Sequence, residues 1–364
     1  MLIRNFGWAM VLTVVAVVVA VLTGGVSTAL IVLLLGVLEI SLSFDNAVVN
    51  AKVLERMHPV WQRAFLTVGI LIAVFGMRLV LPIFIVSVTA SLGFTQVVDL
   101  ALHDPTTYGR ELAGSQALIY AFGGTFLLMI FLDFVLDPER EILWLTPVER
   151  ALQKIGKLDQ LSVLLALGGI YLMSRLADHG EVTKVLLAGI AGLVAYLAVN
   201  GLDALFEESM EGRDDDDAGP VSGSMTTAVF KAGVFSFLYL EVLDASFSFD
   251  GVIGAFAISD KILVIALGLG IGAFWIRSLT IYLVRAGTLS EYVYLEHGAH
   301  WAIGVLAGIM LFSVKYDVSE VVTGLVGVAF IGLSLLSSIL LRKRQGDDDV
   351  DVQDSDQVLG TTQR

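Results

Sequence analysis

The sequence predicts an all-α, polytopic membrane protein with about ten transmembrane helices and an inverted three-helix repeat. Its composition gives the first indication, since 56% of the residues are hydrophobic, 16% are charged and the mean hydropathy is +0.83. Soluble domains carry about 25% charged residues. Apolar runs near the ~20 residues that a membrane crossing requires give the second. The third is an acidic segment that occurs twice in the chain, at residues 38–48 and 243–253, and each copy is called an acidic phrase below.

Composition also excludes several classes of protein. The chain contains no cysteine, so structural disulfides and thiolate metal sites are absent. Its net charge of −14 comes largely from aspartates at 214–217 and 347–356. We therefore expect the lipid bilayer and not a nucleic acid as partner. No nucleotide-binding loop is found, and we do not expect an enzyme; homo-oligomerisation stays open.

The first half of the chain begins with residues 1–25, predicted as a first transmembrane helix or signal anchor. An uncleaved span at 7–22 is favoured, because no small-x-small cleavage site follows it. Residues 26–136 form repeat one, with three spans at about 26–51, 64–88 and 114–136. A polar loop at 99–110 separates the last two spans.

Residues 137–159 read as a cytoplasmic amphipathic helix, either interfacial or packed on neighbouring loops. The remaining segments are two transmembrane helices in 160–206, with spans at 161–176 and 182–205; an acidic cytoplasmic linker at 207–224; repeat two at 225–317, with spans at 227–258, 262–284 and 298–314; a last transmembrane helix at 318–341; and a disordered acidic tail at 342–364.

The distribution of positive charge predicts the orientation. With ten spans, one side of the membrane receives thirteen lysines and arginines and the other side receives five. Cytoplasmic loops carry the excess of these residues. We therefore expect a multi-pass protein of the plasma or inner membrane with both termini in the cytoplasm.

The repeat extends beyond the acidic phrase. Gly69 and Arg78 are nine residues apart in the span after the first phrase, as are Gly268 and Arg277 after the second. The two acidic spans are predicted as numbers two and seven, so they cross the membrane in opposite directions. Inverted repeats of this kind place substrate sites near the bilayer midplane, where the halves meet.

Each acidic phrase supplies candidate cation ligands. A carboxylate at the centre of a membrane helix costs roughly 2.5–3.5 kcal/mol, so four of them need a cation, a proton or an arginine to offset that cost. Carboxylate, amide and hydroxyl oxygens suit Mg²⁺, Ca²⁺ and Mn²⁺. The predicted metal ligands are Glu39, Asp45, Asn46, Asp244 and Asp250.

Neighbouring polar residues receive supporting roles. The two acids of each phrase are six residues apart, which turns them about 120° from each other on a regular helix, so we predict an unwound or kinked segment. Arg78 and Arg277 are expected to balance carboxylate charge, although snorkelling to an interface is the alternative. Glu241, whose repeat counterpart is Gly36, is either a fifth ligand or an interface residue. The supporting serines are Ser41, Ser43, Ser246 and Ser248, unless they only bond back to the previous helical turn.

Three stretches resemble the TerC family of integral membrane proteins: residues 38–48 (LEISLSFDNAV), 247–250 (FSFD) and 123–128 (GGTFLL). The resemblance covers about residues 30 to 315 and is closest to a branch known only as a domain of unknown function. It implies membership of the lysine-exporter superfamily, an inverted three-helix repeat, and the manganese efflux found in several members. The carboxylates at 39, 45, 244 and 250 match the family's intramembrane acids. Gly251 departs from the serine of many relatives.

The predicted function is a secondary transporter that exports a divalent metal cation, with manganese favoured and with proton exchange or a passive channel as alternative modes. An exporter of a small organic cation such as an amino acid would use the same architecture. An intramembrane aspartyl protease also pairs two membrane aspartates, but the expected Gly-x-Gly precedes neither Asp45 nor Asp250. A membrane assembly partner without transport activity stays open.

Overall fold

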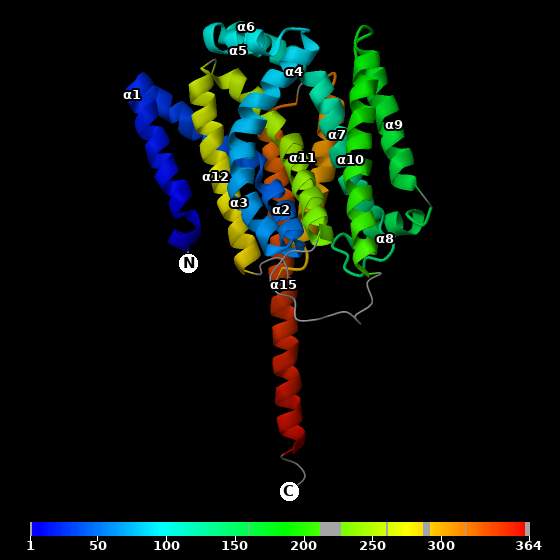
Figure 1. Cartoon of the computed structure of the whole chain (residues 1–364). Helices are drawn as coiled ribbons and strands as arrows, with labels where there is room; N and C mark the ends of the chain where they lie inside the picture. Colours follow the sequence, from blue (N-terminus) through cyan, green and yellow to red (C-terminus); the bar gives the residue numbers. More distant parts are fainter. Residues whose placement is uncertain are drawn as a thin grey trace.

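The computed structural model describes residues 2–158, 160–211, 227–259, 261–286, 292–316 and 318–360, and within them the chain is helical and contains no strand. The elements (Figure 1) are α1 (Leu2–Leu42), α2 (Phe44–Arg56), α3 (Pro59–Leu71), the π-helix η1 (Ile72–Val80), α4 (Leu81–Thr89), α5 (Phe94–His103), α6 (Pro105–Gly114), α7 (Gln116–Leu136), α8 (Thr146–Ile155), α9 (Leu161–Leu176), α10 (Val182–Glu211), α11 (Thr227–Ile258), α12 (Ile262–Ala286), α14 (Leu295–Ser313) and α15 (Glu320–Gly360).

Several helices are long and apolar enough to cross a membrane, which confirms the polytopic, all-helical prediction. Among the described residues there are seven: Phe6–Leu42, Pro59–Thr89, Gln116–Leu136, Val182–Gly201, Ile262–Arg285, Leu295–Ser313 and Val322–Lys343. The shorter apolar helix α9 coincides with the predicted fifth span, and α11 contains the second acidic phrase. The count of ten stays a prediction.

Helix α1 contains the first predicted span and most of the second, which continues into α2, and α1 bends sharply at Gly25 between them. This glycine has φ of +78°, a left-handed conformation that costs glycine little and other residues more. In Figure 1 the first arm rises from the N-terminal end and the second arm runs back down towards α2. The sequence boundary predicted between 22 and 26 therefore falls at a real reversal of the chain.

Both ends of the bundle carry short helices. The region 99–110, predicted as a loop, is instead helical, because Asp104 accepts a hydrogen bond from the Thr107 amide at 3.2 Å and Pro105 starts α6. Helices α5 and α6 lie across one end of the bundle, whereas α8, the start of α1 and the extension of α15 lie at the other end (Figure 1).

The segments predicted between and after the repeats are only partly described. Residues 212–226 of the predicted linker lie outside the described residues. The acidic tail, predicted to be disordered, continues α15 as helix as far as Gly360. No proline interrupts the chain after the last span, and extending an existing helix is easier than nucleating one. The helix therefore extends well below the bundle in Figure 1.

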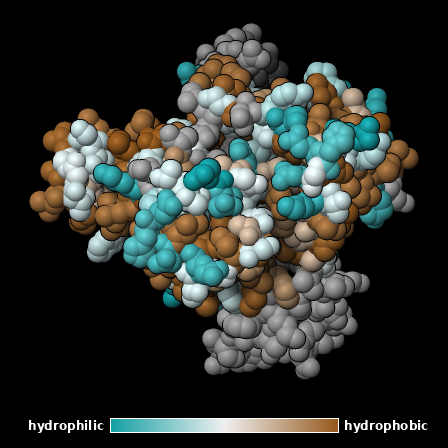
Figure 2. Space-filling model, turned by 90° about the horizontal axis from the view of Figure 1, so that it is seen from above, coloured by the Kyte–Doolittle hydropathy of each residue, from teal (hydrophilic) through white to brown (hydrophobic). Residues whose placement is uncertain are grey.

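Among the described residues, the buried apolar side chains form two clusters. One joins α2, α7, α10 and α14, and the other joins both arms of α1 with α5, α6 and α12. Large apolar side chains also cover the outside of the spans, including Leu22, Leu164 and Leu187, each more than 60% exposed. Seen from above in Figure 2, hydrophilic atoms gather on the end face while hydrophobic atoms dominate the rim. This distribution is that of a bundle surrounded by lipid.

Candidate functional site

A buried ion pair joins the first acidic phrase to the following span. Glu39, near the end of α1, is 1% exposed, and Arg78 of η1 is 5% exposed. Arg78 Nη2 donates a hydrogen bond to Glu39 Oε1, and Nη1 donates to the Ala73 carbonyl. Ser43 Oγ also donates to Glu39 Oε1, at 2.8 Å. Arg78 therefore contacts the Glu39 carboxylate directly, while its charge-balancing role stays a prediction.

The π-helical turns of η1 place Arg78 opposite Glu39. A π-helix has hydrogen bonds between residues five apart, and it is a rare conformation that is frequently found at functional sites. The equivalent arginine of repeat two, Arg277, lies instead in the regular α-helix α12. The two matched spans therefore differ in local geometry even though their glycine and arginine spacing is the same.

A second buried pair occupies the equivalent position in the other half. Arg277 Nη2 lies 4.0 Å from Asp244 Oδ2, and both side chains are less than 10% exposed. The Arg277 guanidinium also lies 3.7 Å above the ring of Phe65 and donates to the Gly69 carbonyl at 3.1 Å. Arg277 thus contacts Asp244 of its own half and two residues of the other half.

Reciprocal contacts connect the two halves at the acidic phrases. Asn46 Nδ2 donates to Asp244 Oδ1 at 2.6 Å. Gly251, which stands where Asn46 stands in the first phrase, lies against Glu39: a Cβ added to it would be 2.5 Å from Glu39 Oε2. Glu39 and Asp244 are themselves equivalent. The residue after the final aspartate of each phrase therefore packs against the first acid of the other phrase.

The backbone breaks in only one of the two phrases. Ser43 is a single turn residue between α1 and α2, with φ of −104° and ψ of 14°, as the prediction of a kink requires. The prediction is wrong for the second phrase, because α11 runs as one helix through it. Apolar packing along α11 and the absence of proline let the helix continue.

The described serines behave in two ways. Ser41 Oγ donates to the Val37 carbonyl and Ser246 Oγ to the Val242 carbonyl, both at 2.9 Å, so these two bond back to the previous turn. Only Ser43 reaches a carboxylate. The Ser248 side chain lies outside the described residues.

The structure describes only part of the predicted four-carboxylate site. The side chains of Asp45 and Asp250 lie outside the described residues, although both positions are helical. Among the side chains that are described, no group of three or more histidine, aspartate and glutamate residues is arranged to hold a metal ion. Metal binding by Glu39, Asp45, Asn46, Asp244 and Asp250 therefore stays a prediction.

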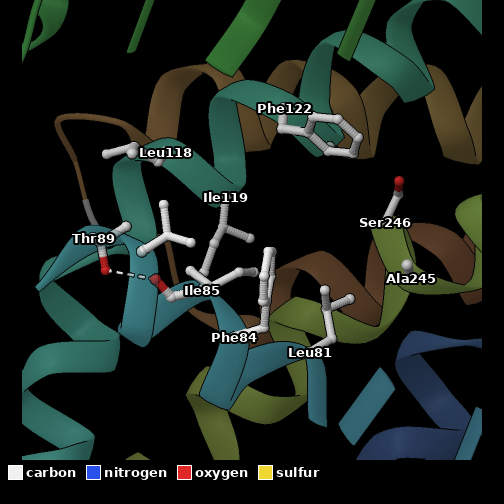
Figure 3. Close-up of a pocket in the computed structure, with 11 residues that line it drawn as sticks. Leu81, Phe84, Ile85, Thr89, Leu118, Ile119, Phe122, Ala245 and Ser246 are labelled. Carbon is white, nitrogen blue, oxygen red and sulfur yellow. Dashed lines mark hydrogen bonds between the residues drawn. The ribbon is translucent and has the colours of Figure 1, made fainter. Parts of the chain in front are cut away.

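An apolar cavity of about 360 Å³ lies beside the second acidic phrase, between α4, α7 and α11 (Figure 3). Ala245 and Ser246 border it from α11, and Phe84 and Phe122 border it from the other two helices. The Thr89 hydroxyl points back to the Ile85 carbonyl, 2.9 Å away. With so few polar groups in its wall, this cavity does not supply cation ligands.

One buried carboxylate outside the repeats was not found from sequence. Glu149 of α8 is 2% exposed and accepts hydrogen bonds from Trp301 Nε1 at 2.8 Å and from the Trp144 amide at 2.9 Å. His297 Nδ1 lies 3.2 Å from Glu149 Oε2. Burial raises the pKa of Glu149, but these hydrogen bonds outweigh it and hold the pKa below its ordinary value. Glu149 attaches α8 to α14, which its amphipathic pattern did not reveal.

Comparisons with known proteins place the chain among membrane proteins. The family described as "Protein of unknown function (DUF475)" matches residues 44–345. The uncharacterized membrane protein YceF of Bacillus subtilis (strain 168) is 29% identical over 122 residues, which make up 33% of this chain and 45% of that protein. The matched region thus spans less than half of that relative. No solved structure matches the chain significantly.

Proposed function

The chain belongs to the DUF475 family, and from its buried site we propose that it is a secondary transporter that exports a divalent metal cation in exchange for protons. Manganese is the favoured substrate. The resemblance of residues 38–48, 123–128 and 247–250 to the TerC family supports this choice. So does the chemistry of the ligands, since oxygen donors without cysteine suit hard or borderline cations.

One observation carries the proposal: the two halves hold equivalent carboxylate–arginine pairs in the interior of the bundle. Glu39 pairs with Arg78 and Asp244 pairs with Arg277. Burying a charge pair costs desolvation energy that the mutual attraction often only balances, so such pairs are poor devices for stability alone. A carboxylate that exchanges an arginine for a cation gives the pair a function.

The halves are proposed to be inverted repeats that meet at this site. The hydrogen bond from Asn46 to Asp244 and the contact of Gly251 with Glu39 are the reciprocal contacts expected from an internal two-fold axis. Rocking of one half against the other would expose the acids to each side in turn. The orientation follows from the thirteen-to-five distribution of positive charge, with both termini in the cytoplasm of the plasma or inner membrane.

During a transport cycle the carboxylates bind either the cation or the arginines and protons. When the cation is absent, Arg78 and Arg277 balance Glu39 and Asp244 and lower the cost of the empty site. A cation of two charges attracts the carboxylates more strongly and displaces the arginines. Protons arriving from the outer side compete for the same oxygens and release the cation there. The gradient of protons would then drive export without ATP.

The proposal is tested with charge-neutral variants of the two acids whose side chains are not described. Asp45→Asn and Asp250→Asn should insert normally, yet fail to protect cells from excess manganese. The matched control is Asp99→Asn, which removes an exposed carboxylate at the end of the bundle. Repeating the assay with magnesium, calcium, zinc and lysine identifies the substrate. Full protection by both site variants would refute the proposed site.

A further inference from the structure

Glu241 is a buried carboxylate with no counterpart in the repeat. It lies one helical turn before Asp244 on α11 and is 4% exposed. Among the described residues, neither of its carboxylate oxygens has a hydrogen-bond partner. Its Oε1 faces Gly69 so closely that a Cβ there would lie 2.8 Å away. An ionised carboxylate in such surroundings is strongly disfavoured.

The equivalent helix crossing in the other half contains glycine instead. Gly36 stands where Glu241 stands, and Gly268 stands where Gly69 stands. A Cβ added to Gly36 would lie 3.4 Å from the Gly268 carbonyl oxygen, so this crossing is also tight. Both halves thus use the same crossing, but only one of them places an acid in it. A role shared equally by the two repeats does not explain that acid.

The charged groups near Glu241 lie on its own helix α11 and on three others, α12, η1 and α1. Asp244 lies on the same helix, and Arg277 of α12 interacts electrostatically with both acids. Arg78 of η1 acts on Arg277 in turn and is itself paired with Glu39 of α1. In the described part of the site, each arginine therefore faces its repeat-equivalent acid, and Glu241 is the acid left over.

We propose that Glu241 carries the coupling proton of the transporter, an inference that rests on the proposed exchange of protons for metal. A hard divalent cation requires several oxygen ligands, and no cluster of three or more acids and histidines includes Glu241 among the described side chains. A proton requires only one carboxylate. Binding of a proton from water makes Glu241 neutral and leaves Arg277 to Asp244. Loss of that proton to water makes Glu241 compete for Arg277 and frees Asp244 for the cation.

The direct test is infrared difference spectroscopy of the full chain in lipid. The carbonyl band of a neutral carboxylic acid should disappear from the wild type when the buffer is changed from neutral to alkaline, and this band should be missing from the same difference spectrum of Glu241→Gln. Glutamine has the shape of a protonated glutamate, so this variant should fold. The control Asp133→Asn removes a carboxylate that accepts a hydrogen bond from Tyr196 at 2.7 Å, and it should keep the Glu241 band. An unchanged spectrum of Glu241→Gln would overturn the proposal.

Gly69→Ala supplies a second variant should Glu241→Gln fail to insert. Its added Cβ forces Glu241 Oε1 to move, so the pH at which the band disappears should shift. Gly270→Ala is the control, because a Cβ there would meet only Val74, at 3.7 Å. An unshifted band in Gly69→Ala would also count against the assignment.

Transport measurements in vesicles that contain the protein distinguish this inference from the proposed function. Glu241→Gln should still move manganese down its gradient while the accompanying movement of protons is lost. Proton movement equal to that of the wild type would overturn the role of Glu241 and leave metal transport intact. If the wild type moves no manganese, while the infrared band still depends on Glu241, the proposed function fails and the proton site remains.

Discussion

Removing Arg78 should destabilise the protein strongly, because Glu39 would be left as an uncompensated buried charge. Both side chains are at most 5% exposed. Breaking a buried ion pair by deleting one partner costs about 3–5 kcal/mol. Ser43 would still donate its hydrogen bond to Glu39 Oε1 at 2.8 Å, so we expect Arg78→Met to lie near the lower end, at about 3 kcal/mol.

A double-mutant cycle measures this interaction directly. The free energies of unfolding of the wild type, Arg78→Met, Glu39→Gln and the double variant would be measured in mixed detergent micelles. The double variant should be more stable than the sum of the single effects predicts, by about 1–3 kcal/mol. Arg110→Met, at an exposed arginine that donates a hydrogen bond to Thr107, should change stability by less than about 0.5 kcal/mol. Additive effects, or an Arg78→Met variant as stable as the Arg110 control, would refute the pairing.

Two further predictions concern helix packing. Gly272→Ala should destabilise the bundle by about 1–3 kcal/mol, because its Cβ would lie 2.4 Å from Glu39 Cβ. Gly270→Ala should be tolerated, because a Cβ there has room. Equal free energies of unfolding for the two variants in detergent would show that α1 and α12 do not pack tightly at Gly272. Glu149 has a pKa below its ordinary value in the folded state, so its contribution to stability is present above about pH 4.3 and is lost as the pH falls towards the folded pKa. Tryptophan fluorescence should therefore report release of α8 in acid, and Glu149→Gln should abolish that transition; an identical acid transition in the variant would contradict the role of Glu149.

The parts of the fold that depend on local pattern could be predicted from the sequence. Hydropathy located the spans that correspond to Pro59–Thr89, Gln116–Leu136 and Ile262–Arg285 to within a few residues at most ends. The span positions were predictable because a bilayer imposes length and polarity on every crossing helix. The internal repeat also singled out Arg78 and Arg277, which contact acids in the structure, while their charge-balancing role stays a prediction.

Features that arise from tertiary packing could not be predicted. Nothing in the local sequence distinguishes the π-helical η1 from the regular α12, although both carry the same spacing of glycine and arginine. The hydrogen bond between Asn46 and Asp244 joins residues 198 positions apart. The loop predicted at 99–110 is helical, and α11 continues through the phrase predicted to unwind. The long-range contacts depend on neighbouring helices, whereas the helix at 99–110 starts from a local cap, Asp104 followed by Pro105, that the sequence reading overlooked.

The central claim is that the buried acids exchange a divalent cation for protons, and the most direct measurement follows both ions in one preparation. Proteoliposomes containing the full chain would be loaded with manganese, with one dye reporting manganese efflux and another reporting the pH of the lumen. We expect an inward proton gradient to accelerate efflux and the efflux to acidify the lumen. Efflux that ignores the proton gradient and leaves the pH of the lumen unchanged would contradict the exchange mechanism.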